Sequence, residues 1–265
     1  MALSSRLAII VGGVGGLGSL AGKVLRSQGA SVALLYAPFE ANTVQPTLRQ
    51  VFESDSPDNV KTYECDITSK TSVDRAFAAI DQDDIDPPCI LVNAAGVVNL
   101  HPLEDFPAED ALRHYMVNLY GPTLTGQAFA KLFFAASERA RQTHKPPPIG
   151  RIVNIASQAA HVALDRHGPY CASKAGLIGL TKCQASEWGP RGLTANTISP
   201  GPVWTELGKR AWADKEVRKA YQAAVPTGKF AEPSEVVRIV SFLCQDEACN
   251  INGADFRLDG GYTAR

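Results

Sequence analysis

The sequence lacks most of the features that mark secreted, membrane or metal-binding proteins. Its 265 residues include only six cysteines, and no two of them have the Cys-x-x-Cys spacing of a zinc or redox site. No apolar run approaches the roughly 18–20 residues of a membrane span. The first run, Leu7–Val11, is also too short for a signal peptide. We therefore expect a cytoplasmic protein with reduced thiols, no metal and no membrane association.

An excess of charge of either sign is also missing. The chain has 26 basic and 27 acidic residues, for a net charge of −1, which gives no electrostatic reason to expect nucleic acid as a partner. Apolar residues make up 45% and charged residues 20%, an ordinary globular composition that excludes disorder, collagen and coiled coil. A chain of this length can bury a sizeable core without disulfides or a metal.

What the sequence does have is a regular alternation of short apolar runs and amphipathic stretches, the pattern of βαβ units. The seven expected strands are Leu7–Val11, Ser31–Leu35, Val60–Cys65, Ile90–Val92, Arg151–Ile155, Thr194–Ile198 and Asp255–Leu258. Helices are expected up to about Gln28, near Ser72–Ile80, over about Pro107–Arg141 and over about Tyr170–Trp188. Right-handed crossovers then give a doubly wound, Rossmann-type α/β fold, with a mostly parallel seven-stranded sheet and helices on both faces.

The proline-rich run His144–Pro148 is the stretch most similar to a linker. It cannot be helical, because proline removes a hydrogen-bond donor and clashes with the preceding turn. A strand follows it at once and the alternation continues, so the run is interpreted as a surface loop. With no internal repeat and no second core, residues 1–265 are expected to form a single domain.

Five of the 22 glycines lie between Gly12 and Gly18. The cluster follows a strand and opens a helix, where glycines permit a tight turn and let backbone N–H groups reach a pyrophosphate. Two registers fit: Gly13, Gly15 and Gly18 match the general dinucleotide fingerprint, whereas Gly12, Gly16 and Gly18 match a Gly-x3-Gly-x-Gly variant. A glycine motif alone is also compatible with an ordinary tight turn, but the strand–turn–helix context favours a nucleotide.

The position that usually holds the ribose of the coenzyme carries no acid in this sequence. The second strand ends in Tyr36-Ala37-Pro38-Phe39, and Glu40 lies past the expected place. No arginine stands nearby to pair with a 2′-phosphate. The motif therefore leaves the choice between NAD(H) and NADP(H) open.

Three polar residues form the candidate catalytic centre. Tyr170 and Lys174 are four residues apart on an expected helix and so share one face. Ser157 follows a strand, at the carboxyl edge where open α/β sheets bind ligands. A tyrosine with its ordinary pKa of about 10 transfers protons poorly at neutral pH, and Lys174 is expected to lower that pKa. Ser157 can stabilise charge that develops on a substrate carbonyl oxygen.

With its motifs in this order, the sequence resembles the short-chain dehydrogenase/reductase family over nearly the whole chain. Gly12, Gly16 and Gly18 are similar to the family's cofactor loop, and Asn93-Ala94-Ala95-Gly96 is similar to its sheet-stabilising turn. The resemblance implies a catalytic tetrad of Asn118, Ser157, Tyr170 and Lys174, in which Asn118 holds a water that links the lysine to solvent. The residues implied in cofactor binding are Gly12, Gly15, Gly16, Leu17, Gly18, Tyr36, Ala37, Asp66, Ile67, Asn93, Ala94, Gly96, Tyr170, Lys174, Pro200, Gly201, Val203 and Thr205.

Several of these residues also have a plainer interpretation. Asp66 either contacts adenine, as in the family, or caps the helix that follows it. Asn118 is either part of the tetrad or a local hydrogen-bonding residue inside a helix. The missing carboxylate after the second strand favours NADP(H) over NAD(H), because a carboxylate there would repel a 2′-phosphate.

The loop between Ser157 and Tyr170 holds two histidines, an acid and an arginine, which favours a hydroxylated or charged small-molecule substrate. The alternative is a solvated surface loop in which Asp165 and Arg166 pair outward. Residues 202–228 match the family's substrate lid. The candidate substrate-contacting residues are His161, Asp165, Trp204 and Leu207.

A local resemblance to the sugar-alcohol dehydrogenase branch implies interconversion of a polyol and a ketose. Two alternatives stay open: a ketone or imine reductase of a secondary-metabolite pathway, including one coupled to cyclisation, and a silent nucleotide-binding regulator. The family usually pairs through its two long helices, here about Pro107–Arg141 and Tyr170–Trp188. The resemblance therefore implies a homodimer or homotetramer.

Overall fold

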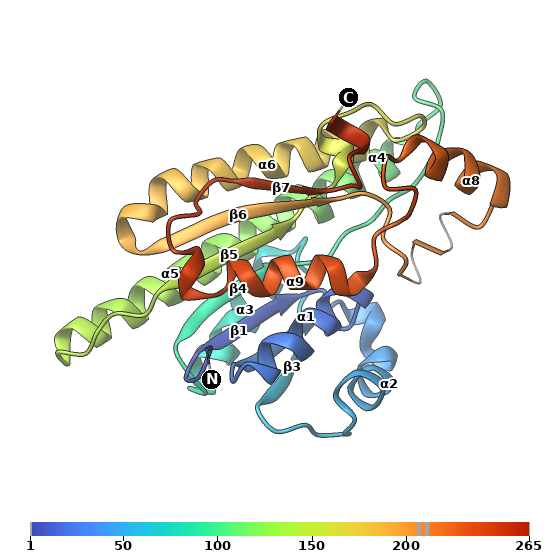
Figure 1. The fold of residues 1–265 in the computed structure, drawn as a ribbon. Coiled ribbons are helices and arrows are strands. Elements are labelled where there is room, and N and C mark those ends of the chain that lie inside the picture. The colour runs from blue at the N-terminus through green and yellow to red at the C-terminus, as the bar shows by residue number, and fades with distance from the viewer. Residues whose placement is uncertain (1, 206–207, 210–211, 265) are drawn as a thin grey trace.

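The computed structural model describes residues 2–205, 208–209 and 212–264 (Figure 1). Its central feature is a seven-stranded sheet in the order β3-β2-β1-β4-β5-β6-β7. The strands are β1 (Leu7–Val11), β2 (Ser31–Tyr36), β3 (Val60–Glu64), β4 (Pro88–Asn93), β5 (Gly150–Ile155), β6 (Leu193–Pro200) and β7 (Asp255–Leu258). Every neighbouring pair is parallel. The seven expected strands are thus confirmed, and the sheet is wholly rather than mostly parallel.

The inner strands are apolar because both faces of the sheet are covered. All five residues of β1 are buried, and they alternate between two cores. Ala8 and Ile10 belong to the core on one face, whereas Leu7, Ile9 and Val11 belong to the core on the other. The alternation follows from the two-residue side-chain period of a strand.

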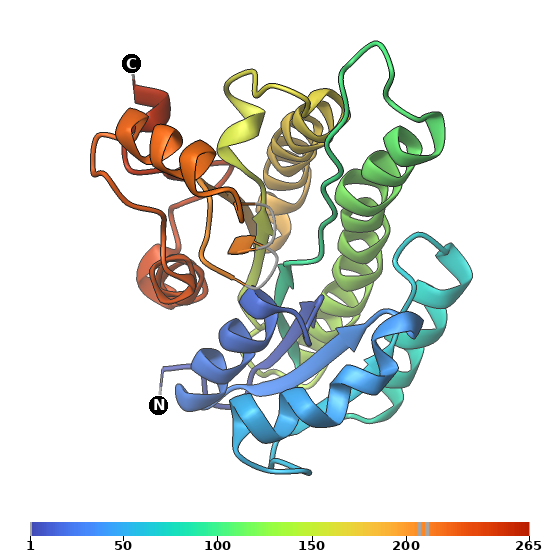
Figure 2. The same cartoon turned by 90° about the vertical axis from the view of Figure 1, so that its right-hand side faces the viewer.

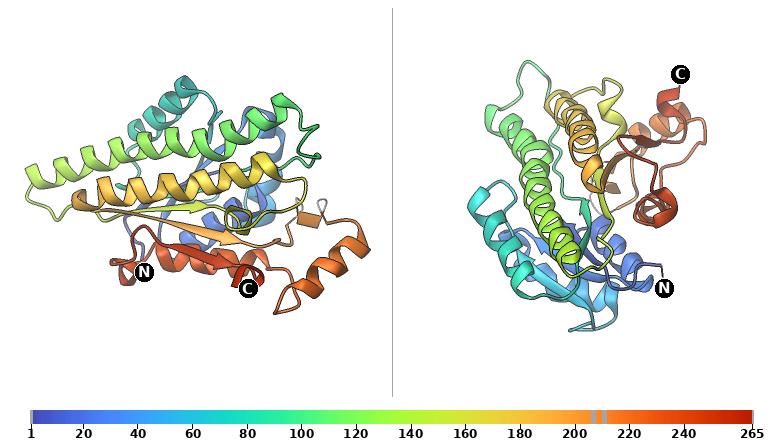
Figure 3. Two further views of the ribbon diagram at one scale, coloured as in Figure 1. Left: turned by 90° about the horizontal axis from the view of Figure 1, so that it is seen from above. Right: turned by 90° about the vertical axis from the view of Figure 1, so that its left-hand side faces the viewer.

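Helices pack on both faces of the sheet (Figure 2). One face is covered by α1 (Gly16–Ser27), α2 (Ala41–Phe52) and α9 (Pro233–Leu243). The other is covered by α3 (Lys70–Gln82), α5 (Gly121–Gln142) and α6 (Gly168–Trp188). In Figure 3, α5 and α6 run side by side along the sheet. Among the described helices, none is both long enough and apolar enough to cross a lipid bilayer.

Three of the described helices, α2, α8 (Lys215–Ala224) and α9, were not anticipated from the sequence pattern. Helix α2 contains Pro46, a residue that is disfavoured inside helices. Its buried residues Val44, Leu48 and Phe52 have the four-residue spacing of an amphipathic helix, and that spacing was the available signal. Helix α9 begins with Pro233 in its first turn, where the missing N–H has no partner to lose.

The helix expected over Pro107–Arg141 is interrupted. It consists of α4 (Ala108–Tyr115), a π-helical turn at Met116–Tyr120, and α5. A π turn inserts an extra residue into the helical repeat and often occurs at functional sites. Here the turn contains Asn118, which is fully buried.

Candidate active site

Strand β1 lies in the interior of the sheet. Strands β2 and β3 are added on one side of it and β4 to β7 on the other, so the strand order reverses between the parallel neighbours β1 and β4. In doubly wound sheets, ligands bind at the carboxyl ends of the strands beside this reversal. The glycine cluster follows β1, residues 94–96 follow β4, and Ser157 follows β5. The fold therefore gathers segments far apart in the sequence at one edge of the sheet.

The glycine turn is built so closely that side chains would not fit in it. Gly12 has a φ of +73°, and a Cβ there would lie 2.8 Å from the backbone nitrogen of Ala95. A Cβ on Gly18 would lie 2.1 Å from the carbonyl oxygen of Gly12. Helix α1 starts at Gly16, and no side chain caps its first turn. Its backbone N–H groups suit a pyrophosphate, so these residues fit a dinucleotide in the register of Gly12, Gly16 and Gly18.

Ser157, Tyr170 and Lys174 converge on one spot. Tyr170 and Lys174 lie in the first two turns of α6, and the Lys174 Nζ atom is 5.9 Å from the centre of the Tyr170 ring. Lys174 is 4% exposed, and its Nζ donates a 2.8 Å hydrogen bond to the carbonyl of Ile155, the last residue of β5. The Ser157 hydroxyl hydrogen-bonds the phenol of Tyr170.

Burial, rather than electrostatic attraction between Tyr170 and Lys174, dominates the pKa values of these two residues. Burial raises the pKa of Tyr170, and its hydrogen bond with Ser157 only partly offsets that increase. Burial also lowers the pKa of Lys174 to about 8. The expectation that Lys174 lowers the pKa of Tyr170 is therefore not met in the isolated chain, because desolvation penalises both charged forms. The phenol is protonated at neutral pH, when it can donate its proton.

Both the oxygen and the nitrogen of the Asn118 carboxamide are hydrogen-bonded. Its Oδ1 accepts a 2.9 Å hydrogen bond from the Val97 N–H, and its Nδ2 donates to the Val97 carbonyl at 3.0 Å. The same Nδ2 donates to the Ser173 hydroxyl at 3.1 Å. Asn118 thus ties the loop after β4 to α6 beside Lys174, which agrees with a local hydrogen-bonding role and places it next to the other three residues.

A buried polar network holds α5 and α6 against the sheet. Asn93 donates to Asn154 on β5 at 2.8 Å and accepts from Thr125 on α5 at 2.8 Å. Asn154 in turn donates to Thr181 and Gln184 on α6, at 2.8 Å and 3.1 Å. Since all members are buried, losing one would leave unpaired polar groups. Asn93 therefore has a structural function, and Ala94 and Gly96 beside it lie at the edge that faces the glycine turn.

The segment after β2 has an acidic side chain that the sequence spacing did not place there. Tyr36 ends β2, and Ala37 precedes the turn Pro38–Glu40. The Glu40 carboxylate turns back, so that its Oε2 accepts a 2.9 Å hydrogen bond from the backbone N–H of Ala37. A negative charge therefore lies beside the end of β2. Phe39, next to it, is 79% exposed.

Asp66 and Ile67 follow β3. The Asp66 Oδ1 accepts from the N–H and the hydroxyl of Thr68, at 2.9 Å and 2.7 Å. The cap of α3 is instead Ser69, so Asp66 stabilises the turn that precedes the helix. Ile67 is buried, and it packs so closely on Gly121 that a Cβ there would lie 2.7 Å from Ile67.

The remaining cofactor candidates follow β6. Pro200 ends that strand, and the N–H of Gly201 donates to the Leu258 carbonyl at 3.0 Å. Val203 forms a bridge with Ala231. A Cβ on Gly16 would lie 3.3 Å from the Thr205 methyl group, so this segment and the glycine turn approach one another.

The candidate substrate residues are spread out. The His161 Nε2 is 2.8 Å from the Asp255 Oδ2 on the edge strand β7, which engages that nitrogen away from Tyr170. Asp165 is exposed, and its neighbour Arg166 donates to the Leu100 carbonyl at 3.2 Å. Trp204 packs on Phe230, with ring centres 5.9 Å apart. Leu207 lies outside the described residues.

Two contacts at this edge were missed by the sequence reasoning. The side chain of Gln158, next to Ser157, donates to the hydroxyl of Tyr221 on α8 (Lys215–Ala224). The ring of His114, a buried residue of α4, meets the ring of Tyr170 at a centre-to-centre distance of 6.1 Å. The signal for His114 was its position four residues before Asn118, on the same helical face.

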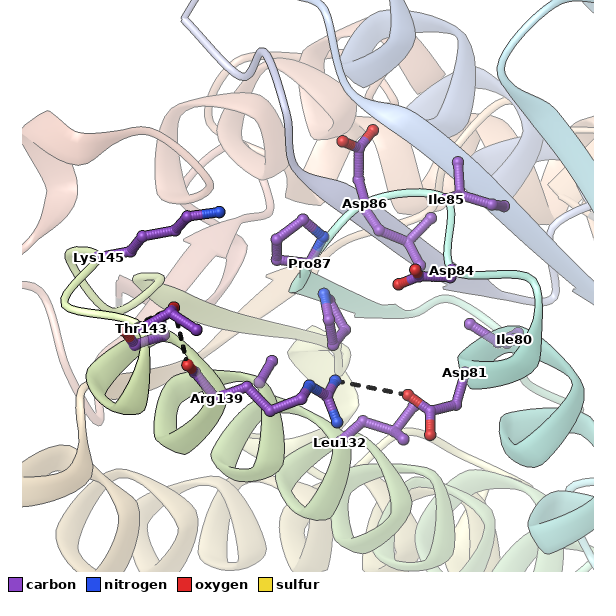
Figure 4. A pocket seen from close by; sticks show the side chains of 14 residues that line it. Ile80, Asp81, Asp84, Ile85, Asp86, Pro87, Leu132, Arg139, Thr143 and Lys145 are labelled. Carbon is purple, nitrogen blue, oxygen red and sulfur yellow. Dashed lines mark hydrogen bonds and ion pairs between the residues drawn. The ribbon is translucent and has the colours of Figure 1, made fainter.

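A cavity of about 330 Å³ opens at the other end of the sheet (Figure 4). It is lined by residues of α3, α5 and the start of β4, and Arg139 and Asp81 approach within 3.6 Å across it. The start of β4 is an amino end, so this cavity is separate from the edge that carries Tyr170.

The chain is similar in sequence to one protein family model and to several characterised proteins. A family model described as enoyl-(acyl carrier protein) reductase matches residues 13–263. D-threitol dehydrogenase of Mycolicibacterium smegmatis is 38% identical over 99% of this chain and 95% of its own. NAD-dependent glycerol dehydrogenase of Listeria innocua is 34% identical over 99% and 96%.

Solved structures agree with this result. A short-chain dehydrogenase/reductase variant of Serratia marcescens has a TM-score of 0.85 at 28% identity, covering 99% of this chain and 100% of its own. A Beutenbergia cavernae protein with bound NADP at low occupancy has a TM-score of 0.87 at 25% identity, covering 100% and 99%.

Proposed function

The chain belongs to the short-chain dehydrogenase/reductase family and is an NAD(P)-dependent oxidoreductase acting on CH–OH groups, and on that premise we propose that it interconverts a polyol and the corresponding ketose. The observation that carries the proposal is the convergence of Ser157, Tyr170 and Lys174 at the carboxyl edge of the sheet. Relatives named as dehydrogenases of threitol and glycerol support the substrate class.

In ketone reduction, the nicotinamide coenzyme supplies the hydride, and the protein must supply a proton and stabilise the carbonyl oxygen. Tyr170 is the proposed proton donor, since its raised pKa keeps it protonated at neutral pH. Ser157 is proposed to hydrogen-bond the same oxygen. Lys174, with a pKa of about 8, is mostly charged at pH 7, and its Nζ atom lies 5.9 Å from the centre of the Tyr170 ring. Asn118 holds the loop and α6 together beside Lys174.

The protonation of Tyr170 gives ketone reduction and alcohol oxidation opposite dependences on pH. Reduction requires the protonated phenol, whereas oxidation of the alcohol requires the phenolate as base. Because burial raises the pKa of Tyr170 above its ordinary value of about 10, we expect alcohol oxidation to become faster and ketone reduction slower as the pH rises above about 10.

We propose NADP(H) as the preferred coenzyme, because neither Tyr36 nor Ala37 carries a carboxylate. The Beutenbergia cavernae protein with NADP supports this choice, whereas the Listeria innocua relative is named as NAD-dependent. Glu40, whose carboxylate lies at the N–H of Ala37, is proposed to limit affinity for the 2′-phosphate.

The segment 202–228 is the proposed substrate lid. It contains α8, which has no buried residue and is attached through Tyr221. Trp204 and Trp212 of the same segment both pack on Phe230, with ring centres 5.9 Å and 5.2 Å apart. Leu207 of this segment remains a predicted substrate contact, as do His161 and Asp165.

We further propose that two copies associate through the long helices of the α4–α5 and α6 face. Leu112, Tyr115 and Tyr120 on this part of the chain are between 40% and 59% exposed. Burial of such apolar side chains would favour a dimer or tetramer, and light scattering of the purified chain measures its mass directly.

The proposal is tested by following NADH and NADPH oxidation against a panel of ketoses and simple apolar ketones. The expected result is turnover with short ketoses, such as erythrulose and dihydroxyacetone, at rates above those with apolar ketones. Preference for a cyclic ketone or an imine would instead favour a biosynthetic reductase. Coenzyme binding without turnover of any substrate would favour a silent regulator.

A further inference from the structure

Two side chains on one face of the α4–α5 helix make parallel sets of contacts. Asn118 bonds the loop after β4 at Val97 and contacts α6 at Ser173. One turn earlier, His114 accepts a 3.0 Å hydrogen bond from the Asn99 N–H and contacts α6 at the Tyr170 ring. Both residues are fully buried. Each therefore connects the same loop to the same helix, at neighbouring positions.

The hydrogen bonds of His114 fix its tautomer and its orientation. Because a backbone N–H can only donate, the Nε2 that faces Asn99 must be an unprotonated acceptor. The proton then lies on Nδ1, which is 2.6 Å from the carbonyl oxygen of Asp110. With both nitrogens engaged, the imidazole is neutral and its plane is set.

The ring of His114 is part of a row of aromatic contacts that ends at Tyr170. Phe106 meets His114 at 5.7 Å and 70°, and His114 meets Tyr170 at 6.1 Å and 76°. Such edge-to-face contacts contribute beyond the area they bury. Tyr170 also meets His167, with ring centres 6.0 Å apart. Two imidazoles thus contact the Tyr170 ring.

We propose that His114 is a positioning residue that holds the Tyr170 ring, through this ring contact, in the place from which its hydroxyl reaches both Ser157 and the substrate. The proposal rests on the proposed function for its catalytic consequence, although the ring contact itself does not. Since a misplacement of about 1 Å can cost about 100-fold in rate, a buried residue outside the catalytic group can have a large effect.

Charged and titratable groups from several elements face Tyr170. Lys174 and Cys171 lie on its own helix, His167 directly precedes that helix, and His114 comes from α4. Ser157, from the end of β5, bonds its hydroxyl. Of these, His114 is fully buried and contacts the Tyr170 ring rather than its hydroxyl.

The test uses the full chain labelled with 3-fluorotyrosine and followed by ¹⁹F NMR. The Tyr170 resonance is assigned among the seven tyrosines by the Tyr170→Phe variant, and its titration requires no turnover. His114→Ala is expected to shift the Tyr170 midpoint downward by about 0.5–1 pH unit, because water reaches the phenolate. The kcat for reduction should fall about 10- to 100-fold, with the KM for the coenzyme unchanged.

Two further variants separate the ring contact from the hydrogen bond. His114→Phe keeps a ring against Tyr170 but loses the acceptor for Asn99, and it should retain the Tyr170 titration and most of the kcat. His114→Gln keeps an acceptor but loses the ring, so it should show the same shift of the Tyr170 midpoint and the same fall in kcat as His114→Ala. It takes the place of His114→Ala if that variant does not fold. His101→Ala is the matched control, since His101 contacts Phe106 but has no ring contact with Tyr170 in the described structure.

An unchanged Tyr170 resonance and titration in folded His114→Ala or His114→Gln would overturn the proposal, as would a His114→Phe that behaves like His114→Ala. A shifted titration in a chain that reduces no substrate would instead support the ring contact and contradict the proposed function. The two claims therefore fail separately.

Discussion

The buried amine of Lys174 makes a specific prediction about how stability depends on pH. In the folded chain its pKa is lowered from 10.5 to about 8 by burial, whereas in the unfolded chain it has its ordinary value. Between pH 8 and 10.5 the unfolded chain therefore binds more protons than the folded chain, so the contribution of Lys174 to the free energy of unfolding rises with pH. Below pH 8 the folded state carries the full cost of a buried ammonium group, and above 10.5 that cost is absent.

The size of the effect follows from the shift. At about 1.4 kcal/mol per pKa unit, lowering the pKa from 10.5 to about 8 corresponds to roughly 3 kcal/mol across that window. Other groups also titrate there, so the quantity to measure is the difference between the wild type and Lys174→Met. Methionine has a similar length and no charge, so it removes the titrating group together with its hydrogen bond to Ile155.

Urea unfolding at pH 7 to 10.5 measures this difference. The wild type should gain about 3 kcal/mol relative to Lys174→Met between pH 8 and 10.5, with no further change below pH 7.5. Lys182→Met, at an exposed position of the same helix, is the control and should follow the wild type. A difference that stays flat over this range would refute the claim that Lys174 is buried without a compensating anion.

Three other substitutions probe the rest of the site. Gly18→Ala places a Cβ 2.1 Å from the Gly12 carbonyl, so it should weaken NAD(P)H binding at least about tenfold, measured by coenzyme fluorescence. Glu40→Gln removes the charge beside β2 and should tighten NADPH about five- to tenfold while leaving NADH nearly unchanged. Tyr221→Phe removes the acceptor for Gln158; because one hydrogen bond contributes about 1 kcal/mol, amide exchange in residues 215–224 should become about fivefold faster.

For each of these three predictions, a specific outcome would contradict it. Gly179→Ala is the control for the glycine turn, since a Cβ there meets nothing within 4 Å and the change should stabilise α6 slightly. Equal coenzyme affinity in the Gly18 and Gly179 variants would contradict the close-packed turn. Unchanged NADPH affinity in Glu40→Gln would show that the carboxylate does not face the coenzyme, and unchanged exchange over 215–224 would show that α8 is held elsewhere.

The sheet could be predicted from the sequence because its strands are apolar runs buried on both faces. Leu7–Val11 is five buried residues in a row, which no exposed loop would contain. Helix α2 was missed although Val44, Leu48 and Phe52 have helical spacing, because three apolar residues separated by polar ones form no continuous apolar run. The interruption before α5 was also missed, since a π turn leaves no mark in the apolar periodicity.

The location of the candidate site was predictable because it depends on chain order and strand ends. Tyr170 and Lys174 share a helical face by spacing alone, and Ser157 follows a strand. The electrostatics were not predictable, because they depend on burial: Lys174 was expected to act on Tyr170, whereas burial dominates the pKa of both. Side-chain orientations, such as that of Glu40 turning back on Ala37, required coordinates.

The central claim is that Tyr170 gives the proton in carbonyl reduction, and one comparison tests it directly. The kcat/KM for ketose reduction is measured at pH 7 for the wild type and for Tyr170→Phe, which keeps the ring packed on His114 and loses only the hydroxyl. The account predicts a loss of about 10²–10⁴-fold with the coenzyme dissociation constant unchanged. Undiminished turnover by folded Tyr170→Phe would contradict it.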